Sequence, residues 1–216
     1  MGQSESSDPF SIFPHSYQAL CDLLDLHRGL LYTENWSAGA DFLQLIVDHC
    51  LADKPQVILE CSSGLTTLML ARACQLAGCG RVYSLENGEE YASTTQEALD
   101  RYNLGQIGRV VHAPLETYCI NGREFQWYAP PGLPDKSIDM LVIDGPPGFI
   151  QKNSRYPALP LLFDKLSEGC AVYLDDAARE DERETVEFWQ AEYPLLEHEY
   201  IQTERGCSLL KLKKSG

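Results

Sequence analysis

The sequence lacks a CxxC motif, an export signal and any apolar run long enough to cross a membrane. Its first ten residues, MGQSESSDPF, contain neither a basic segment nor an apolar core. The eight cysteines are scattered, and several fall in predicted strands or helices, where cysteine acts as a small buried apolar side chain. These absences favour a cytoplasmic protein with reduced thiols.

Positive charge is also scarce. The 17 Lys and Arg residues face 32 Asp and Glu residues, which gives a formal net charge of −15. Nucleic acids and anionic membranes are bound by clustered Lys and Arg side chains. The only basic cluster, Lys211, Lys213 and Lys214, lies at the end of the chain and is interpreted as a solvated tail. We therefore expect no nucleic-acid or membrane partner, whereas a small ligand fits the charge.

The chain does contain enough apolar residues for a sizeable core, with 44% hydrophobic and 10% aromatic residues. Its length favours one domain with an added N-terminal segment. Helical periods predict helices over 16–30 and 38–51, the second capped by Ser37. We thus predict a helical segment, residues 1–54, packed on a core domain, residues 55–216. The N-terminal helices either cover a cofactor or form a homodimer surface.

Beyond this segment, short apolar strands alternate with helices. Strands are predicted at 57–61, 81–86, 109–112, 138–144 and 170–174, and helices at 66–77, 89–102, 158–166 and 180–193. Residues 195–212 predict a closing hairpin, and residues 115–135 are the least regular part. This order predicts an α/β fold of the Rossmann-like kind: a doubly wound, mostly parallel sheet with an antiparallel C-terminal hairpin.

Polar and small residues gather at the predicted carboxyl ends of the strands, where ligands bind in such sheets. An acid stands at four of the five ends, and the fifth carries His112 and Ala113. The acids are Glu60, Glu86, Asp144 and the pair Asp175 and Asp176. A polar loop explains any one of these positions, but it does not explain an acid at four of them.

The first of these ends opens a loop, ECSSGLTT, that has a single glycine, Gly64. A dinucleotide-binding loop needs several glycines so that backbone amides receive a pyrophosphate. Glu60 repels a diphosphate but suits a cation, and Glu86, about twenty residues after Gly64, suits two ribose hydroxyls. A cationic adenosine without phosphate fits both facts, and S-adenosylmethionine is such a molecule. A nicotinamide-dependent oxidoreductase is the disfavoured alternative.

Four stretches of the chain together resemble a known family. They are ILECSSGLTTLMLA, YSLENGEEY, IDMLVIDGPPG and GCAVYLDDAARED. In order and spacing they resemble the class I S-adenosylmethionine-dependent methyltransferases of the family 24 type, which are O-methyltransferase-like. The resemblance runs from about Trp36 to the end of the chain. It implies a seven-stranded sheet whose last strand is antiparallel.

The resemblance also implies which residues bind the cofactor. Those at its methionine end are Glu60, Ser62 and Gly64, with Thr66, Thr67 and Asp144 beside them. Glu86 would hold the ribose, and Asn87 and Ala113 would border the adenine. Ser62 departs from the glycine of the family. Because serine does not favour a positive φ, we expect the geometry of this turn to depart from that of a glycine.

Asp144, Asp175 and Asp176 are expected to converge, although they are separated in sequence. Three crowded carboxylates need protons, hydrogen bonds or a cation, and their hard oxygens suit Mg²⁺. Some catechol-type O-methyltransferases hold a metal with acids at these strand ends. The alternative is structural: Asp144 caps the following turn, and the other two cap a helix or pair with Arg179. A lysine just after Asp144, the base of catechol-type enzymes, is missing here.

Methyl transfer to a hydroxyl needs a group that removes its proton. The candidates are Asp144, His112 and Lys152, in that order. Six residues are expected in loops above the sheet, as hydrophobic lids or substrate walls: Trp36, Trp127, Tyr128, Phe149, Arg155 and Tyr156. Arg155 either meets an anionic group of the substrate or pairs with one of the local acids.

The sequence therefore predicts an S-adenosylmethionine-dependent methyltransferase that acts on a small molecule, at oxygen, with or without Mg²⁺. The alternative is a regulatory protein that binds S-adenosylmethionine and has lost turnover. Ser62 and the missing lysine are the features that motivate this alternative.

Overall fold

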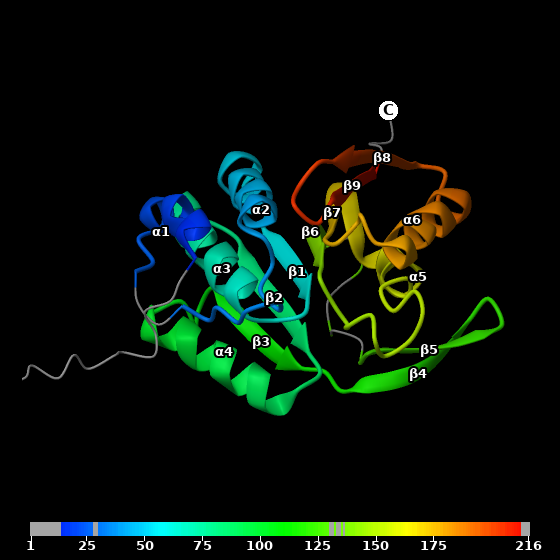
Figure 1. Ribbon diagram of the computed structural model, residues 1–216, viewed down its shortest axis with the longest axis horizontal. Coiled ribbons are helices and arrows are strands. Elements are labelled where there is room, and N and C mark those ends of the chain that lie inside the picture. Colours follow the sequence, from blue (N-terminus) through cyan, green and yellow to red (C-terminus); the bar gives the residue numbers. More distant parts are fainter. Residues whose placement is uncertain (1–13, 28–29, 130–131, 133–134, 136, 213–216) are drawn as a thin grey trace, which may run out of the picture.

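A seven-stranded sheet forms the centre of the computed structural model, which describes residues 14–27, 30–129, 132, 135 and 137–212 (Figure 1). Five parallel strands lie side by side, and the sixth, β9, is antiparallel to its two neighbours. Across the sheet the strands are β3 (Gly108–His112), β2 (Arg81–Glu86), β1 (Val57–Cys61), β6 (Ile138–Ile143), β7 (Leu166–Leu174), β9 (Cys207–Leu212) and β8 (Leu196–Ile201). The predicted doubly wound sheet with a C-terminal hairpin is confirmed.

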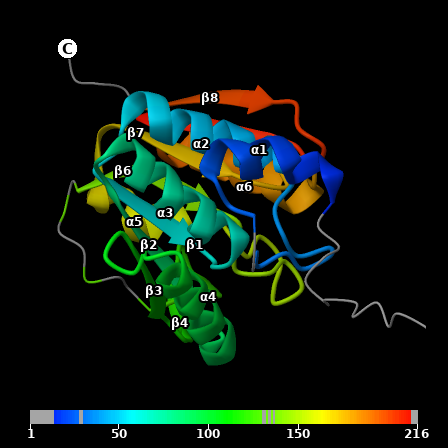
Figure 2. The same ribbon diagram turned by 90° about the vertical axis from the view of Figure 1, so that its left-hand side faces the viewer.

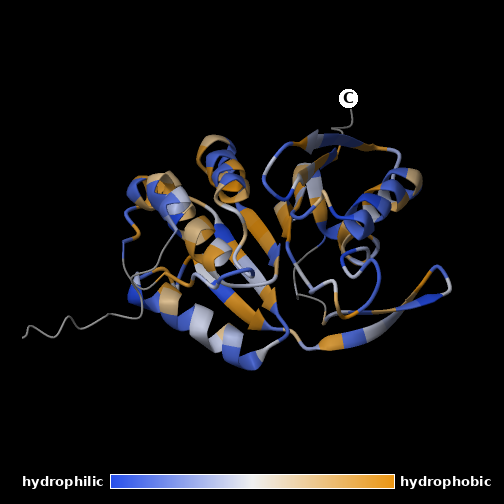
Figure 3. Ribbon diagram, viewed as in Figure 1, coloured by the Kyte–Doolittle hydropathy of each residue, from blue (hydrophilic) through white to orange (hydrophobic). Residues whose placement is uncertain are grey.

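Helices cover both faces of the sheet (Figures 1 and 2). One face carries η1 (His15–Tyr17), α1 (Gln18–Leu24), α2 (Ala40–Asp53), α3 (Leu65–Ala77) and α4 (Glu89–Arg101); the other carries α5 (Ala158–Leu162), η2 (Phe163–Lys165) and α6 (Glu180–Glu192). Two hydrophobic clusters fill the core: the first lies between the sheet and α1 to α4, and the second between the sheet and α5 and α6. Successive strand residues point to opposite faces, so Ile58 belongs to the first cluster and Leu59 to the second. Both faces are buried, and for this reason the central strands are apolar along their length (Figure 3).

Four predicted boundaries are wrong. Helix α1 ends at Leu24 rather than near residue 30, because Asp25 takes a left-handed conformation with φ 51°. Ser37 does not cap α2, because the N-cap is Gly39. The hydroxyl of Ser37 instead accepts a hydrogen bond from the amide of Thr33 at 2.9 Å. Helix α5 is short, and β7 begins at Leu166, four residues before the prediction.

The irregular region after β3 contains a hairpin that the sequence prediction missed. Strands β4 (Leu115–Ile120) and β5 (Arg123–Tyr128) pair antiparallel around Asn121 and Gly122, whose φ values are 50° and 76°. Asn-Gly between alternating polar and apolar residues is the usual sequence of such a two-residue turn. The hairpin extends past the edge of the main sheet (Figure 1) and buries Trp127 against the second cluster.

Candidate active site

The candidate site lies where the strand order reverses, at the carboxyl ends of β1 and β6. The chain enters the sheet at β1, moves outward through β2 and β3, and returns to the other side of β1 as β6. The amide of Asp144 donates to the carbonyl oxygen of Cys61 at 3.1 Å, and the amide of Ser62 donates to that of Leu85 at 3.0 Å. These bonds tie the three strand ends together.

The loop after β1 has the backbone of a glycine-rich turn although it contains one glycine. Ser62 has φ 130° and Gly64 has φ 139°. The expectation that the geometry of this turn would depart from that of a glycine is wrong for φ of Ser62. Glycine adopts such angles freely, whereas a side chain is strained there. The loop therefore keeps an open, glycine-like path at the expense of strain at Ser62.

This strain predicts the effect of Ser62→Gly. The variant should be more stable than the parent by about 1 kcal/mol, because glycine relieves the unfavourable φ. Urea unfolding of both proteins measures the difference. Ser63→Gly, one position along the same loop, is the matched control, because Ser63 does not have a positive φ and glycine there should destabilise. Equal stability of Ser62→Gly and parent would show that the turn is unstrained.

Glu60 lies at the end of β1 and is fully buried beneath the start of α3. Its Oε2 accepts hydrogen bonds from the hydroxyls of Thr67, at 2.7 Å, and Ser84, at 2.5 Å. Its Oε1 is buried without a hydrogen-bond partner. Burial raises the pKa of Glu60 to about 8, against the opposing effect of the two hydroxyls. The structure thus holds an unpaired carboxyl oxygen beside the loop after β1, where a cationic group would satisfy it.

Glu86 ends the neighbouring strand and faces the same loop. Its carboxylate accepts a hydrogen bond from the hydroxyl of Ser63 at 2.8 Å and from the amide of Gly88 at 2.9 Å. The amide of Ala113 donates to the carbonyl oxygen of Glu86 at 2.7 Å, which holds the end of β3 beside it. Asn87 follows directly and is half-buried. The predicted ribose and adenine positions are therefore contiguous in space, and Ser63 joins them.

Two threonines, Thr66 and Thr67, lie in the first turn of α3. Thr67 is fully buried and supports Glu60, and its hydroxyl also accepts a hydrogen bond from the amide of Gly64 at 3.1 Å. Thr66 is buried as well. Thr67 therefore holds both Glu60 and the loop after β1 in place.

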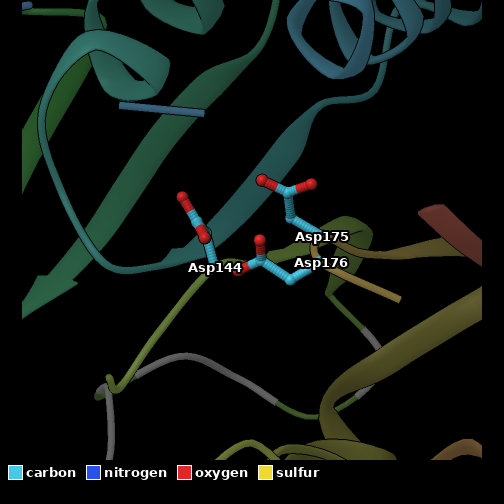
Figure 4. Close-up of side chains that lie close together, drawn as sticks. All are labelled: Asp144, Asp175 and Asp176. Carbon is cyan, nitrogen blue, oxygen red and sulfur yellow. The ribbon is translucent and has the colours of Figure 1, made fainter. Parts of the chain in front are cut away.

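The three aspartates predicted to converge do so (Figure 4). Asp144 follows β6, and Asp175 and Asp176 follow β7; one oxygen of each lies within 4.8 Å of the others. Burial raises the pKa of Asp144 to about 7 and that of Asp175 to about 8. Both oxygens of Asp175 and Oδ1 of Asp176 are buried without a hydrogen-bond partner.

Arg155 is part of this acid cluster, not of a substrate loop. Its side chain is 3% exposed, and its Nη2 lies 3.2 Å from Oδ1 of Asp144 and 2.8 Å from Oδ2 of Asp176. Pairing with the local acids, the alternative to a substrate contact, is what the structure shows. Arg179 reaches the same oxygen of Asp176 from the solvent side at 2.8 Å.

Of the three candidate bases, only Asp144 lies at the point where β1 and β6 meet. His112 is exposed at the end of β3, and three strand spacings, about 14 Å, separate β3 from β6. Lys152 is 61% exposed and pairs with Glu184 of α6 at 2.8 Å. That hydrogen bond raises the pKa of Lys152, whereas a lysine base needs a lowered one. The geometry favours Asp144.

The aromatic residues expected around the substrate separate into two groups. Trp127 and Tyr128 lie in β5, so their assignment to loops is wrong. Tyr156 does lie in the loop before α5, but all three side chains are buried in the second cluster. The hydroxyl of Tyr156 donates to Glu192 of α6 at 2.6 Å. Trp36 is 61% exposed and packs edge-to-face on Phe149, which is 79% exposed and follows the turn after Asp144. These two rings are available to a ligand.

Sequence reasoning missed Ser63, which bonds to Glu86, and two further members of the site. Ser84 is buried and donates to Glu60, and its signal is its place beside Glu60 in the register of β1 and β2. The other is Gly145. A Cβ at this position would collide with the hydroxyl of Tyr128 and lie 3.2 Å from Cβ of Ser62. The need for glycine at position 145 comes from contact with Tyr128 of the β4–β5 hairpin, which the sequence does not indicate.

The sequence matches a known protein family, and the fold is shared by solved structures. A family model described as a methyltransferase domain covers residues 59–177, more than half of the chain. No curated protein matches significantly. Among solved structures, an O-methyltransferase from Bacillus cereus in complex with S-adenosylhomocysteine has a TM-score of 0.64 and 16% identity, with 94% of each chain covered.

Two further solved structures share the fold. The O-methyltransferase TomG from Streptomyces achromogenes, in complex with S-adenosylmethionine, has a TM-score of 0.60 and 14% identity and covers 93% of this chain and 91% of its own. A methyltransferase from Geobacter sulfurreducens has a TM-score of 0.59 and 13% identity, with 94% and 92% covered. Among the helices described here, none combines the length and the apolar character that a membrane span requires.

Proposed function

Because this chain belongs to the methyltransferase-domain family, we propose that it transfers a methyl group from S-adenosylmethionine to a hydroxyl oxygen of a small molecule. The observation that carries the proposal is the buried, unpaired Oε1 of Glu60 beside a loop with glycine-like φ angles. Glu60 and the loop suit the ammonium and carboxylate end of the cofactor. Glu86, Ser63 and Ala113 suit its ribose and adenine. The two structures that carry this cofactor or its product support the assignment.

When bound, the cofactor supplies a methyl group that its sulfonium already activates. The chain must then place the acceptor in line with it and receive the proton of the hydroxyl. Asp144 suits the second task, since burial raises its pKa to about 7 and its side chain remains 14% exposed. Arg155 holds the carboxylate through Oδ1. We assign Asp144 the role of proton acceptor.

Trp36 and Phe149 suit the part of the acceptor that lies away from its reacting hydroxyl. Their rings are exposed and in mutual contact at 6.2 Å between centroids, although 113 positions separate them in the chain. Two adjacent exposed rings favour an acceptor with an apolar or aromatic portion.

The acid cluster raises the further question of Mg²⁺. Its carboxylate oxygens are the right kind of ligand, but the guanidinium of Arg155 already bridges Asp144 and Asp176. A divalent ion between the same two carboxylates would lie against this fixed positive charge. The residues do not fit the ion well, and no step is assigned to it.

Glu86→Gln tests the proposed cofactor site. Calorimetric titration with S-adenosylhomocysteine should show one-to-one binding to the parent and roughly 10- to 100-fold weaker binding to the variant, because charged hydrogen bonds to the ribose are lost. Glu90→Gln, a nearby exposed acid, is the matched control and should bind like the parent.

Three outcomes are informative. Unchanged affinity of Glu86→Gln would remove Glu86 from the ribose site. Absence of binding to the parent would overturn the proposal. Tight binding without methyl transfer to any member of a broad panel of hydroxyl compounds would favour a protein that binds the cofactor without turnover.

A further inference from the structure

We propose that Arg155 is the resident cation of the acid cluster, in the place that a divalent ion would take, and that it positions Asp144 without a metal. The positioning of Asp144 for reaction rests on the proposed methyl transfer. The occupation of the cluster by Arg155 does not, because it follows from the contacts of this side chain alone.

The first observation is the bridge that Arg155 forms. A single nitrogen, Nη2, contacts Oδ2 of Asp176 at 2.8 Å and Oδ1 of Asp144 at 3.2 Å. Glu182 lies 3.7 Å from the other terminal nitrogen, Nη1. Guanidinium remains charged in proteins, and its planar donors match carboxylates. The positive charge therefore lies between the carboxylates of two strand ends.

The second observation is that Arg155 also clamps the backbone. Nη2 donates to the carbonyl oxygen of Asp144 at 2.8 Å, and Nη1 donates to that of Asp175 at 2.8 Å. These carbonyls terminate the adjacent strands β6 and β7. One side chain thus fixes the backbone from which all three aspartates project, as well as the carboxylate of Asp144.

The third observation is that Arg155 cannot easily leave. The preceding hydroxyl, that of Ser154, donates to the carbonyl oxygen of Pro146 at 3.0 Å in a buried position. The side-chain amide of Asn153 donates to Glu184 at 2.9 Å and to the carbonyl oxygen of Asp181 at 3.1 Å. With its own side chain 3% exposed, Arg155 is held in the cluster by the anchored side chains of the two residues that precede it.

A divalent ion and Arg155 would therefore exclude each other. Mg²⁺ bound by Asp144 and Asp176 would lie about 2.1 Å from their oxygens, next to Nη2 of Arg155. If Arg155 is removed, the cluster instead keeps three aspartates with several unpaired buried oxygens and no buried cation among the described residues around it. Such a cluster should bind a divalent ion.

The experiment measures metal binding in the full chain. Electron paramagnetic resonance of free Mn²⁺ should show no binding by the parent at millimolar concentrations, and Mg²⁺ should leave its melting temperature unchanged. Arg155→Met should bind one Mn²⁺ at least about tenfold more tightly than the parent, and Mg²⁺ should raise its melting temperature. Adding Asp175→Asn and Asp176→Asn to this variant should abolish the gained binding.

Two further variants serve as controls. Arg179→Met removes the other partner of Asp176, but this arginine is 54% exposed, so the variant should remain as insensitive to metals as the parent. Arg155→Lys keeps a positive charge but lacks the planar donors of guanidinium, and it should bind Mn²⁺ less tightly than Arg155→Met. It also replaces Arg155→Met if that protein does not fold.

Two results would overturn the proposal: stoichiometric Mn²⁺ binding by the parent that the two Asp→Asn substitutions abolish, or no gain of Mn²⁺ binding in either Arg155 variant. Titration of the parent with S-adenosylhomocysteine in metal-free buffer tests the proposed function separately, because it measures cofactor binding and not metal binding by the acid cluster. Failure of one measurement is thus distinguishable from failure of the other.

Discussion

Replacing Glu60 by Gln should weaken the binding of S-adenosylhomocysteine by about 100-fold. The variant keeps the shape of the side chain and an acceptor for Thr67 and Ser84. It cannot release a proton to become a carboxylate, which is the proposed partner of the ammonium group of the ligand at Oε1. Isothermal calorimetry at pH 7 measures the change.

The same substitution should stabilise the protein that carries no ligand. Burial raises the pKa of Glu60 to about 8, so the folded protein holds a proton that the unfolded chain releases near pH 4.5. Stability from this group is therefore complete below pH 4.5 and is lost as the pH rises through about 8. Glu60→Gln removes this loss, and its melting temperature at pH 8 should exceed that of the parent.

Proton release supplies a control on the mechanism. If a cationic group pairs with Glu60, ligand binding at pH 7 should expel up to one proton from the parent and none from the variant. Titrations in two buffers with different ionisation enthalpies measure this number. Parent-like affinity together with parent-like proton release in Glu60→Gln would exclude Glu60 from the cofactor site.

Gly145→Ala should have the second large effect. The new Cβ would collide with the hydroxyl of the buried Tyr128 and lie 3.2 Å from both Cβ of Ser62 and the carbonyl oxygen of Cys61. Overpacking of this kind costs about 1–3 kcal/mol, and here the strained loop after β1, the proposed cofactor loop, is one of the neighbours that must move. We expect a lower free energy of unfolding and weaker cofactor binding together, measured by urea unfolding and calorimetry.

Two companions of this variant isolate the cause. Gly148→Ala is the matched control, because a Cβ there meets no atom within 4 Å and the residue is exposed; it should behave like the parent. Adding Tyr128→Phe to Gly145→Ala removes the colliding hydroxyl and should recover part of the stability. No recovery would show that the collision with Tyr128 is not what destabilises Gly145→Ala.

Much of the fold was predictable because its signals are local. The bounds of β1 and β2 were predicted to the residue, since each strand is a short apolar run between turn residues. The hairpin of β4 and β5 was missed, although Asn121 and Gly122 mark its turn. Its polar and aromatic strands lack the apolar run that identified the others.

The site was predictable only in part. The convergence of Asp144, Asp175 and Asp176 follows from topology, because neighbouring parallel strands end at one edge. The burial of Arg155 does not follow, since the path of its loop depends on bonds to α6 and to Pro146. The same long-range packing buried Trp127 and Tyr156, whose sequence neighbours indicated loops.

The exposed ring of Trp36 has an optical consequence. The chain has three tryptophans, and the other two, Trp127 and Trp189, are 1% and 0% exposed. The red-shifted part of the intrinsic fluorescence therefore comes from one indole, in contact with Phe149 beside the turn that follows Asp144. Trp36 is therefore an intrinsic fluorescent reporter at the proposed acceptor site.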